Sequence, residues 1–219
     1  MLVLDTASRR PCVALIEKTK PVSTRHSDDE ASLSLFPLIK SLLEERSLKL
    51  SDLRAIAFCE GPGSMLGIRT AIMGIRTWIG TEQLIDCNLF SFNSLQIGKL
   101  IISSGKPDRA SFLVVTDARR QSWNCLQAGS DSNASEIEVI ENETLEKSDL
   151  PIYSFDEFPS WTRSAANIVR LPYRPESIFR SPGFPSLLKP NPNSEPLNTR
   201  AIEFAKWIPQ ARTSDRIES

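Results

Sequence analysis

The stretch Gly61-Pro62-Gly63-Ser64 lies between an apolar run at residues 53–59 and a helical pattern at residues 65–79. A short apolar run that ends in a glycine turn is typical of a buried strand. Ser64 stands directly before the first helical residue, which is the usual position of an N-cap. The stretch therefore predicts a buried strand that passes through a tight turn into a capped helix, the arrangement of an α/β fold.

Two interpretations of this turn remain open. Free N–H groups at a helix N-terminus and the positive end of the helix dipole suit an anion. Alternatively, the glycines permit a tight turn and close packing of the helix against the strand. The turn lacks the Gly-Lys-Ser ending of a P-loop and the three glycines of a dinucleotide fingerprint. The candidate residual contacts with an anion or nucleotide are Asp5, Gly61, Gly63 and Ser64.

The helix after Ser64 has one face almost without side chains, because Gly67, Ala71 and Gly74 recur at helical spacing. Another backbone can approach such a face closely. Arg69 and Arg76 lie one heptad apart on a different face. The helix is therefore either a core helix with a solvated basic edge or an interface for another protein.

A second helix is predicted after Ser27, where the Ser-x-x-Glu spacing of Ser27 and Glu30 is that of a capping box. Apolar residues follow at helical spacing and form the second half of the candidate partner interface. That interface comprises Leu35, Leu38, Leu42, Gly67, Ala71, Gly74, Arg69 and Arg76.

Two hairpins are predicted, one at residues 2–16 and one at residues 111–128. The tip of the second hairpin carries Asp117 beside Arg119 and Arg120. These charged residues either contact a phosphate or a partner, or they form a turn that is only solvated. Ten of the fifteen prolines fall after residue 150, and seven of these lie in residues 172–196, which predicts a long irregular connection. We divide the chain into an N-terminal lobe, 1–105, and a smaller proline-rich lobe, 106–219.

Composition limits the chemistry. His26 is the only histidine, which excludes a zinc site built on paired histidines, and no carboxylate pair stands out as an acid and a base. The four cysteines lie far apart without a Cys-x-x-Cys pair, and the net charge of −1 gives no general attraction for nucleic acid. No metal site and no catalytic residue are predicted. A binding or scaffolding protein is at least as well supported as an enzyme.

The first residues run directly into a predicted strand, without the basic and apolar segments of a signal peptide. No run approaches the roughly 18 apolar residues that a membrane helix needs. We expect a cytoplasmic protein that does not contact a membrane.

Taken together, several motifs in order resemble the TsaB (YeaZ) family, which belongs with TsaD to the glycoprotease-like branch of the actin and Hsp70 (ASKHA) fold. The most specific stretch is Gly-Pro-Gly-Ser-x-x-Gly-x-Arg at residues 61–69. The other matching segments are Leu4-Asp5-Thr6-Ala7-Ser8, Val13-Ala14-Leu15, His26-Ser27, Ala55-Ile56-Ala57 and Asp117-Ala118-Arg119-Arg120.

The resemblance implies an α/β protein of two ribonuclease-H-like lobes, the second short or degenerate, because the match weakens beyond Gly129. It implies a non-catalytic subunit that binds TsaD during formation of N6-threonylcarbamoyladenosine at position 37 of tRNAs that read codons beginning with A. The two predicted helices would form a bundle with the matching helices of TsaD, or with a second copy of the chain when TsaD is absent.

The same resemblance implies further partners and cofactors. TsaE, an ATPase, would join through the TsaB–TsaD complex, and tRNA would be contacted only indirectly. ATP and metal are expected on TsaD and TsaE, and no cofactor is expected on this chain alone. The superfamily's first phosphate loop uses glycine, but no glycine occurs between Asp5 and Cys12. The alternative function is a nucleotide-dependent transferase or kinase that uses Asp5 and the Gly61 turn for phosphate.

Overall fold

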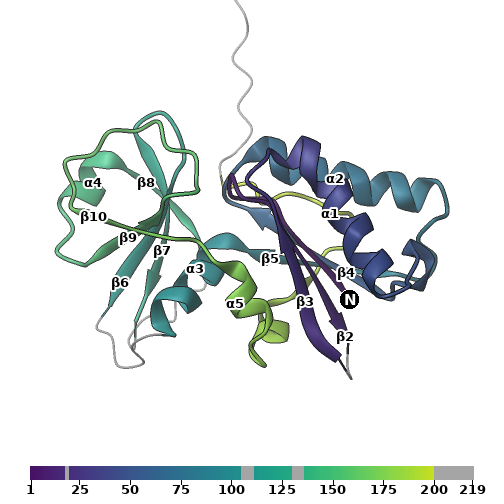
Figure 1. Cartoon of the computed structure of the whole chain (residues 1–219). Helices are drawn as coiled ribbons and strands as arrows, with labels where there is room; N and C mark the ends of the chain where they lie inside the picture. Colours follow the sequence, from purple (N-terminus) through teal and green to yellow (C-terminus); the bar gives the residue numbers. More distant parts are fainter. Residues whose placement is uncertain (18–19, 105–110, 130–135, 200–219) are drawn as a thin grey trace, which may run out of the picture.

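The computed structural model describes residues 1–17, 20–104, 111–129 and 136–199. Figure 1 shows two lobes side by side, each built on one β-sheet. The expected lobe boundary at residues 105 and 106 lies outside the described residues. So does most of residues 199–207, where the spacing of apolar residues predicts a last helix. No helix of the described part is long and apolar enough to span a membrane.

The sheet of the first lobe has the order β11-β5-β4-β1-β2-β3. Its central strand β1 pairs antiparallel with β2 and parallel with β4, which is the ribonuclease-H-like arrangement that the resemblance implies. The strands are β1 (Leu2–Asp5), β2 (Cys12–Glu17), β3 (Lys20–His26), β4 (Ala55–Gly61), β5 (Asn88–Asn93) and β11 (Lys189–Pro190).

The second sheet repeats this topology in the order β10-β9-β6-β7-β8. Strand β6 is central, with an antiparallel hairpin on one side and a parallel strand on the other. The strands are β6 (Phe112–Asp117), β7 (Ser122–Ala128), β8 (Glu138–Glu141), β9 (Ile152–Phe155) and β10 (Ile168–Leu171). The second lobe is short in its helices rather than in its sheet, since α4 (Asn142–Glu146) has five residues.

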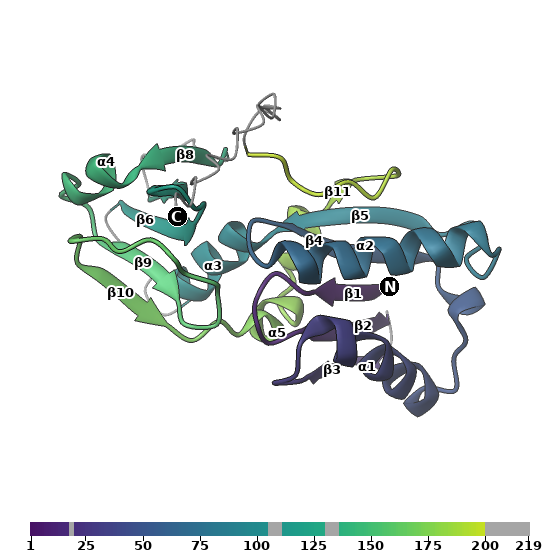
Figure 2. The ribbon, with the colours of Figure 1, turned by 90° about the horizontal axis from the view of Figure 1, so that it is seen from above.

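Helices α1 (Ala31–Glu45) and α2 (Met65–Gly80) lie together over one face of the first sheet (Figure 2). Helix α1 begins at Ala31 without a side-chain cap, so the predicted capping box is wrong: the Ser27 hydroxyl oxygen accepts the N–H of Asp29 instead. Helix α2 begins as predicted, with the Ser64 hydroxyl oxygen accepting the N–H of Gly67 at 3.2 Å. A short 3₁₀ helix, η1 (Leu50–Asp52), leads into β4.

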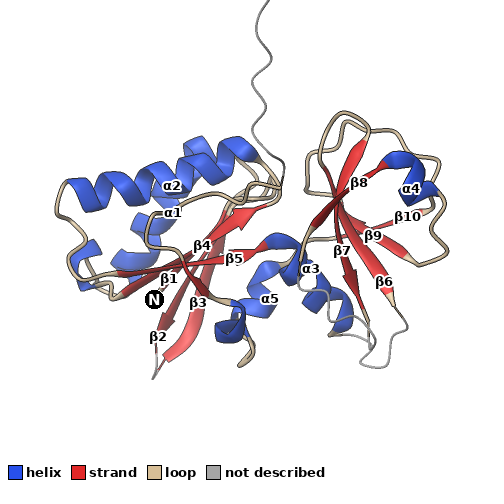
Figure 3. Ribbon diagram, turned by 180° about the vertical axis from the view of Figure 1, so that it is seen from behind, coloured by secondary structure: helices blue, strands red, loops and turns tan. Residues whose placement is uncertain are grey.

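Helices α3 (Ser94–Ser103) and α5 (Pro175–Phe179) lie between the two sheets, as Figure 3 shows. One continuous apolar core runs from the first sheet through these helices to Phe155 and Phe158 of the second lobe. Strands β1 and β4 are buried on both faces, which is why their sequences are apolar runs rather than alternating patterns.

The proline-rich segment returns to the first lobe. After α5 it forms the 3₁₀ helix η2 (Phe184–Leu187), and β11 then adds to the edge of the first sheet beside β5. The N–H of Leu197 donates to the carbonyl of Glu60, and the Arg76 guanidinium donates to the carbonyls of Asn193 and Ser194. The segment is mostly irregular, as predicted, but hydrogen bonds hold it against α2.

The turn before α2 packs against the loop that joins β1 to β2. A Cβ atom on Gly63 would lie 2.3 Å from the carbonyl oxygen of Ala7, and one on Gly67 would lie 2.2 Å from that of Thr6. The N–H of Ser64 donates to the Ala7 carbonyl at 2.6 Å. Only glycine permits these approaches, so the close-packing interpretation of the glycines describes this structure.

Asp5, at the end of β1, joins the first lobe to the returning segment. One of its carboxylate oxygens accepts the hydroxyl of Tyr173 at 2.9 Å, and the other accepts the N–H of Ala7 at 3.1 Å. Its side chain is buried, and this burial raises the pKa of Asp5 to about 6, although both hydrogen bonds act to lower it. Folding therefore favours the protonated carboxyl group.

We predict that Asp5→Asn changes the pH dependence of stability. Because the pKa of Asp5 is raised in the folded state, its stabilisation is full below pH 4 and is lost as the pH rises through 6. Between these limits the free energy of unfolding of the wild type should fall by up to about 3 kcal/mol relative to the variant. Urea unfolding of both proteins from pH 4 to 7.5 measures this, and a difference independent of pH would contradict it.

We also predict opposite effects of two glycine substitutions in α2. Gly67→Ala should lower the free energy of unfolding by about 2 kcal/mol or more, because the methyl group collides with a backbone carbonyl. Gly80→Ala is the matched control, since nothing lies within 4 Å of its Cβ position. It should leave stability unchanged or raise it by about 0.5 kcal/mol. Equal urea midpoints for the two variants would refute the close packing.

Candidate functional site

The residues predicted to contact an anion do not form one open site. Gly61 and Gly63 line the cleft between the lobes, but Asp5 is buried and both of its carboxylate oxygens are engaged inside the chain. The N–H groups of Ser64 and Gly67 likewise have acceptors in the chain. Asp5 is therefore not available to a phosphate in this structure, which corrects its assignment as a contact.

The small-residue face of α2 turns inward. Gly67 packs on Thr6, Ala71 is 1% exposed, and a Cβ on Gly74 would lie 2.8 Å from the ring of Phe36 on α1. The loop after β1 and helix α1 of this chain cover the small residues of α2, so these residues are not available to a partner. The sequence shows a small face but cannot show which surface covers it.

The other predicted interface residues divide between interior and surface. Leu35 and Leu42 are fully buried in the core and Leu38 is half-buried, which removes the first two from any surface. Arg69 is exposed on α2. Arg76 is exposed as well, and its guanidinium is bonded to the returning segment. The prediction that these two helices meet a partner stays a prediction, but it must use other residues.

The outward side of the helix pair carries large apolar side chains, which we call the outer helical surface: Leu33, Phe36, Leu66 and Met73. Their exposed fractions are 71%, 41%, 63% and 57%. A groove of about 420 Å³ is lined by three of them, Phe36, Leu66 and Met73, with Trp78 and Arg69 among its other lining residues. Leu66 and Met73 lie seven residues apart, so their spacing could have shown this second apolar face.

The Phe36 ring meets the Trp78 ring edge to face, with centroids 5.9 Å apart, and the same ring covers Gly74. Phe36 therefore packs α1 against α2, and both helices contribute to the outer helical surface.

A larger cleft of about 590 Å³ lies between the lobes. One wall is the turn before α2 and the first residues of that helix; the other is the β6–β7 turn with Trp161, and residues 197–199 lie at the rim. One carboxylate oxygen of Asp117 accepts the N–H groups of Trp161 and Thr162, and the other accepts that of Arg119. Asp117 thus organises the cleft wall rather than lying at a solvated tip.

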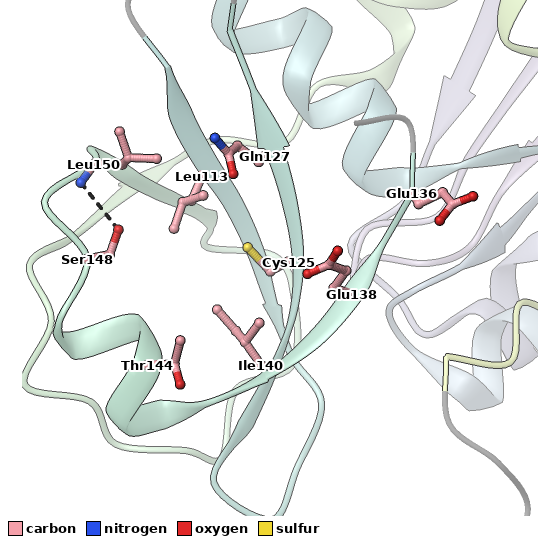
Figure 4. A pocket seen from close by; sticks show the side chains of 9 residues that line it. All are labelled: Leu113, Cys125, Gln127, Glu136, Glu138, Ile140, Thr144, Ser148 and Leu150. Atoms are coloured by element: carbon pink, nitrogen blue, oxygen red, sulfur yellow. Dashed lines mark hydrogen bonds between the residues drawn. The ribbon is translucent and has the colours of Figure 1, made fainter. Parts of the chain in front are cut away.

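A smaller cavity of about 230 Å³ lies in the second lobe, and Figure 4 shows Leu113, Cys125 and Ile140 among the side chains around it. Burial and the nearby Glu138 raise the pKa of the Cys125 thiol to about 11, so this cysteine is protonated and a poor nucleophile. Within the described residues, no group of His, Cys, Asp and Glu side chains is arranged to hold a metal ion.

Several known proteins are similar to this chain in sequence or in structure. The family described as TsaD, tRNA N6-adenosine threonylcarbamoyltransferase, matches residues 22–132, about half of the chain. The TsaB protein of Buchnera aphidicola, described as a tRNA threonylcarbamoyladenosine biosynthesis protein, is 33% identical over 73 residues. That match covers 33% of this chain and 35% of the Buchnera protein, so it spans only about a third of either.

Two solved structures match nearly the whole chain. YeaZ from Pseudomonas aeruginosa superposes with a TM-score of 0.63 at 21% identity, covering 90% of this chain and 98% of YeaZ. A second structure from that organism, described as similar to peptidase YeaZ, has the same TM-score and identity and covers 91% and 98%. At this identity they show a shared two-lobe fold. The family match over half of the chain, together with the Buchnera relative and the ordered motifs, shows the family: the chain belongs to the TsaB/YeaZ family of proteins with a TsaD-like domain.

Proposed function

We propose that the chain is a non-catalytic scaffold subunit that binds TsaD in the formation of N6-threonylcarbamoyladenosine at position 37 of tRNAs. The observation that carries this proposal is the outer helical surface, where four large apolar side chains are exposed on α1 and α2. Contiguous apolar patches on soluble proteins commonly mark interaction sites. These are the two helices that the family resemblance assigns to a bundle with TsaD.

The chemistry of the surface suits a helical partner. A groove lined by Leu66, Met73 and Phe36 accepts apolar side chains from a helix laid along α2, in the manner of ridges packing into grooves. Arg69 at the groove adds one cation that can pair with an acidic residue of the partner. A second copy of this chain would offer the same surface, so a homodimer through it competes with TsaD.

In this proposal TsaE joins through the complex, and ATP and metal are bound by TsaD and TsaE. Catalytic silence is supported by Asp5, the acidic residue at the end of the first strand. Its oxygens are used by Tyr173 and Ala7, and the loop after it has no glycine that would let a phosphate approach the backbone.

The competing function, a nucleotide-dependent transferase or kinase, would need Asp5 at the surface of the cleft. It is tested by incubating the chain alone with ATP and Mg²⁺ and measuring phosphate release. We expect a background rate that is the same for wild type and Asp5→Asn. A rate that depends on Asp5 would favour the enzyme and count against the scaffold.

We predict that a charge on the outer helical surface abolishes TsaD binding. Leu66→Asp and Met73→Asp should each weaken co-elution with TsaD by about tenfold or more, because an aspartate buried in an apolar contact has no partner. Val169→Asp is the matched control, since Val169 is an exposed apolar residue on β10 of the other lobe. Unimpaired co-elution of both helix variants, with all variants folded by circular dichroism, would overturn the proposal.

A further inference from the structure

We propose that residues 201–208 of this chain form a helix that occupies the groove on the outer helical surface when no partner is bound. The contact is made within the chain, and it needs neither TsaD nor a ligand. Its consequence, that this segment and TsaD compete for one surface, rests on the proposed function. The contact itself does not.

The first observation is that the described chain ends beside this groove. The N–H of Leu197 donates to the carbonyl of Glu60 at 2.8 Å, just before the turn that leads into α2. Residues 197–199 line the cleft between the lobes together with Leu66 and Arg69, and these two α2 residues also line the outer groove. The chain therefore leaves the described part next to the start of the groove.

The second observation is the sequence that follows, which has the pattern of an amphipathic helix. Its apolar positions have the i, i+3, i+4, i+7 spacing of one helical face: Ala201, Phe204, Ala205 and Ile208. Glu203 and Lys206 fall on the opposite face, and Pro209 marks the end of the pattern. A helix of this length is not stable alone in water, so its apolar face needs a surface on which to pack.

The third observation is that the segment has the right length. The groove residues on α2 extend from Leu66 to Trp78, which is about 18 Å along the helix axis. A helix over residues 201–208 is about 12 Å long, and each extended residue before it adds about 3.3 Å. Starting from residue 199 and running in the same direction as α2, the segment covers the groove from Leu66 past Met73.

The two surfaces are complementary in chemistry. Phe36, Leu66 and Met73 present exposed apolar side chains to the groove, and Phe204 and Ile208 supply an aromatic and a branched side chain to cover them. Removal of this apolar area from water is favourable. Because the tether is so short, the effective concentration of the segment at the groove is on the order of millimolar, which exceeds that of a second copy in dilute solution.

The contact gives the outer helical surface a competitor within the chain. In the proposed function TsaD uses the same exposed side chains, so TsaD binds only to molecules from which the segment has moved away. Its apparent affinity is reduced by the fraction of molecules in which the groove is covered. The segment thus sets the strength of the partner contact.

The contact is tested in the full chain, without TsaD, by disulfide trapping. In the parallel arrangement residue 205 lies beside Thr70, a half-buried groove residue one turn after Leu66. Thr70→Cys and Ala205→Cys are combined in a Cys87→Ser background, since the other three cysteines are buried. Mild oxidation should form an intramolecular disulfide at least about tenfold faster than in the matched pair of Val169→Cys with Ala205→Cys.

Mass spectrometry of dilute samples distinguishes the outcomes of this experiment. Faster intramolecular trapping at position 70 supports the contact, because Val169 is an exposed residue of the other lobe. Equal rates for the two pairs overturn it. Disulfides that join two molecules would assign the groove to a second copy of the chain, and they overturn it as well.

The competition is tested by calorimetry with TsaD. Phe204→Asp should raise the affinity for TsaD by about tenfold, because it removes the competitor from the groove. Lys206→Asp is the matched control, since it places the same charge on the opposite face, and it should leave the affinity unchanged. If the wild type binds TsaD and Phe204→Asp does not bind it more tightly, the competition is refuted and the scaffold proposal stands. If no variant binds TsaD, the scaffold proposal fails, and disulfide trapping still decides the contact.

Discussion

The arrangement of the first lobe depends on the contact of Gly63 and Gly67 with the carbonyl oxygens of Ala7 and Thr6. These approaches leave no room for a Cβ atom, so they fix both the position of α2 over the sheet and its rotation about its own axis. With the small residues of α2 turned inward, Leu66 and Met73 must face outward. The surface that we assign to a partner is therefore a consequence of packing inside the chain.

The same contact explains why the loop between β1 and β2 packs against protein atoms. In an ASKHA protein this loop would approach a phosphate, but here its carbonyls are covered by the start of α2, and Asp5 behind it is bonded to Tyr173. Protein atoms therefore cover the loop where the family resemblance would place a phosphate. The open cleft lies between the start of α2 and Trp161. Leu66 and Arg69 line both this cleft and the outer groove, so the two openings are adjacent on the surface.

Much of the fold could be predicted from the sequence, because its signals are local. The Gly61 turn, the Ser64 cap and both hairpins appear where the patterns place them. The candidate site could not be predicted as well. Whether Ala71 faces a partner or the chain's own core depends on α1, and the bond between Asp5 and Tyr173 joins residues 168 positions apart. Trp161 carries no motif, and only the folded chain brings it to the cleft.

The central claim is that TsaD meets the outward side of α1 and α2. A photoreactive amino acid introduced singly at Met73, at Leu33 or at Val169 tests it at the level of residues, after irradiation in the presence of TsaD and analysis of the cross-linked products. Our account predicts covalent products with TsaD from positions 73 and 33 and none from position 169. Cross-linking from position 169, with none from the two helices, would contradict it.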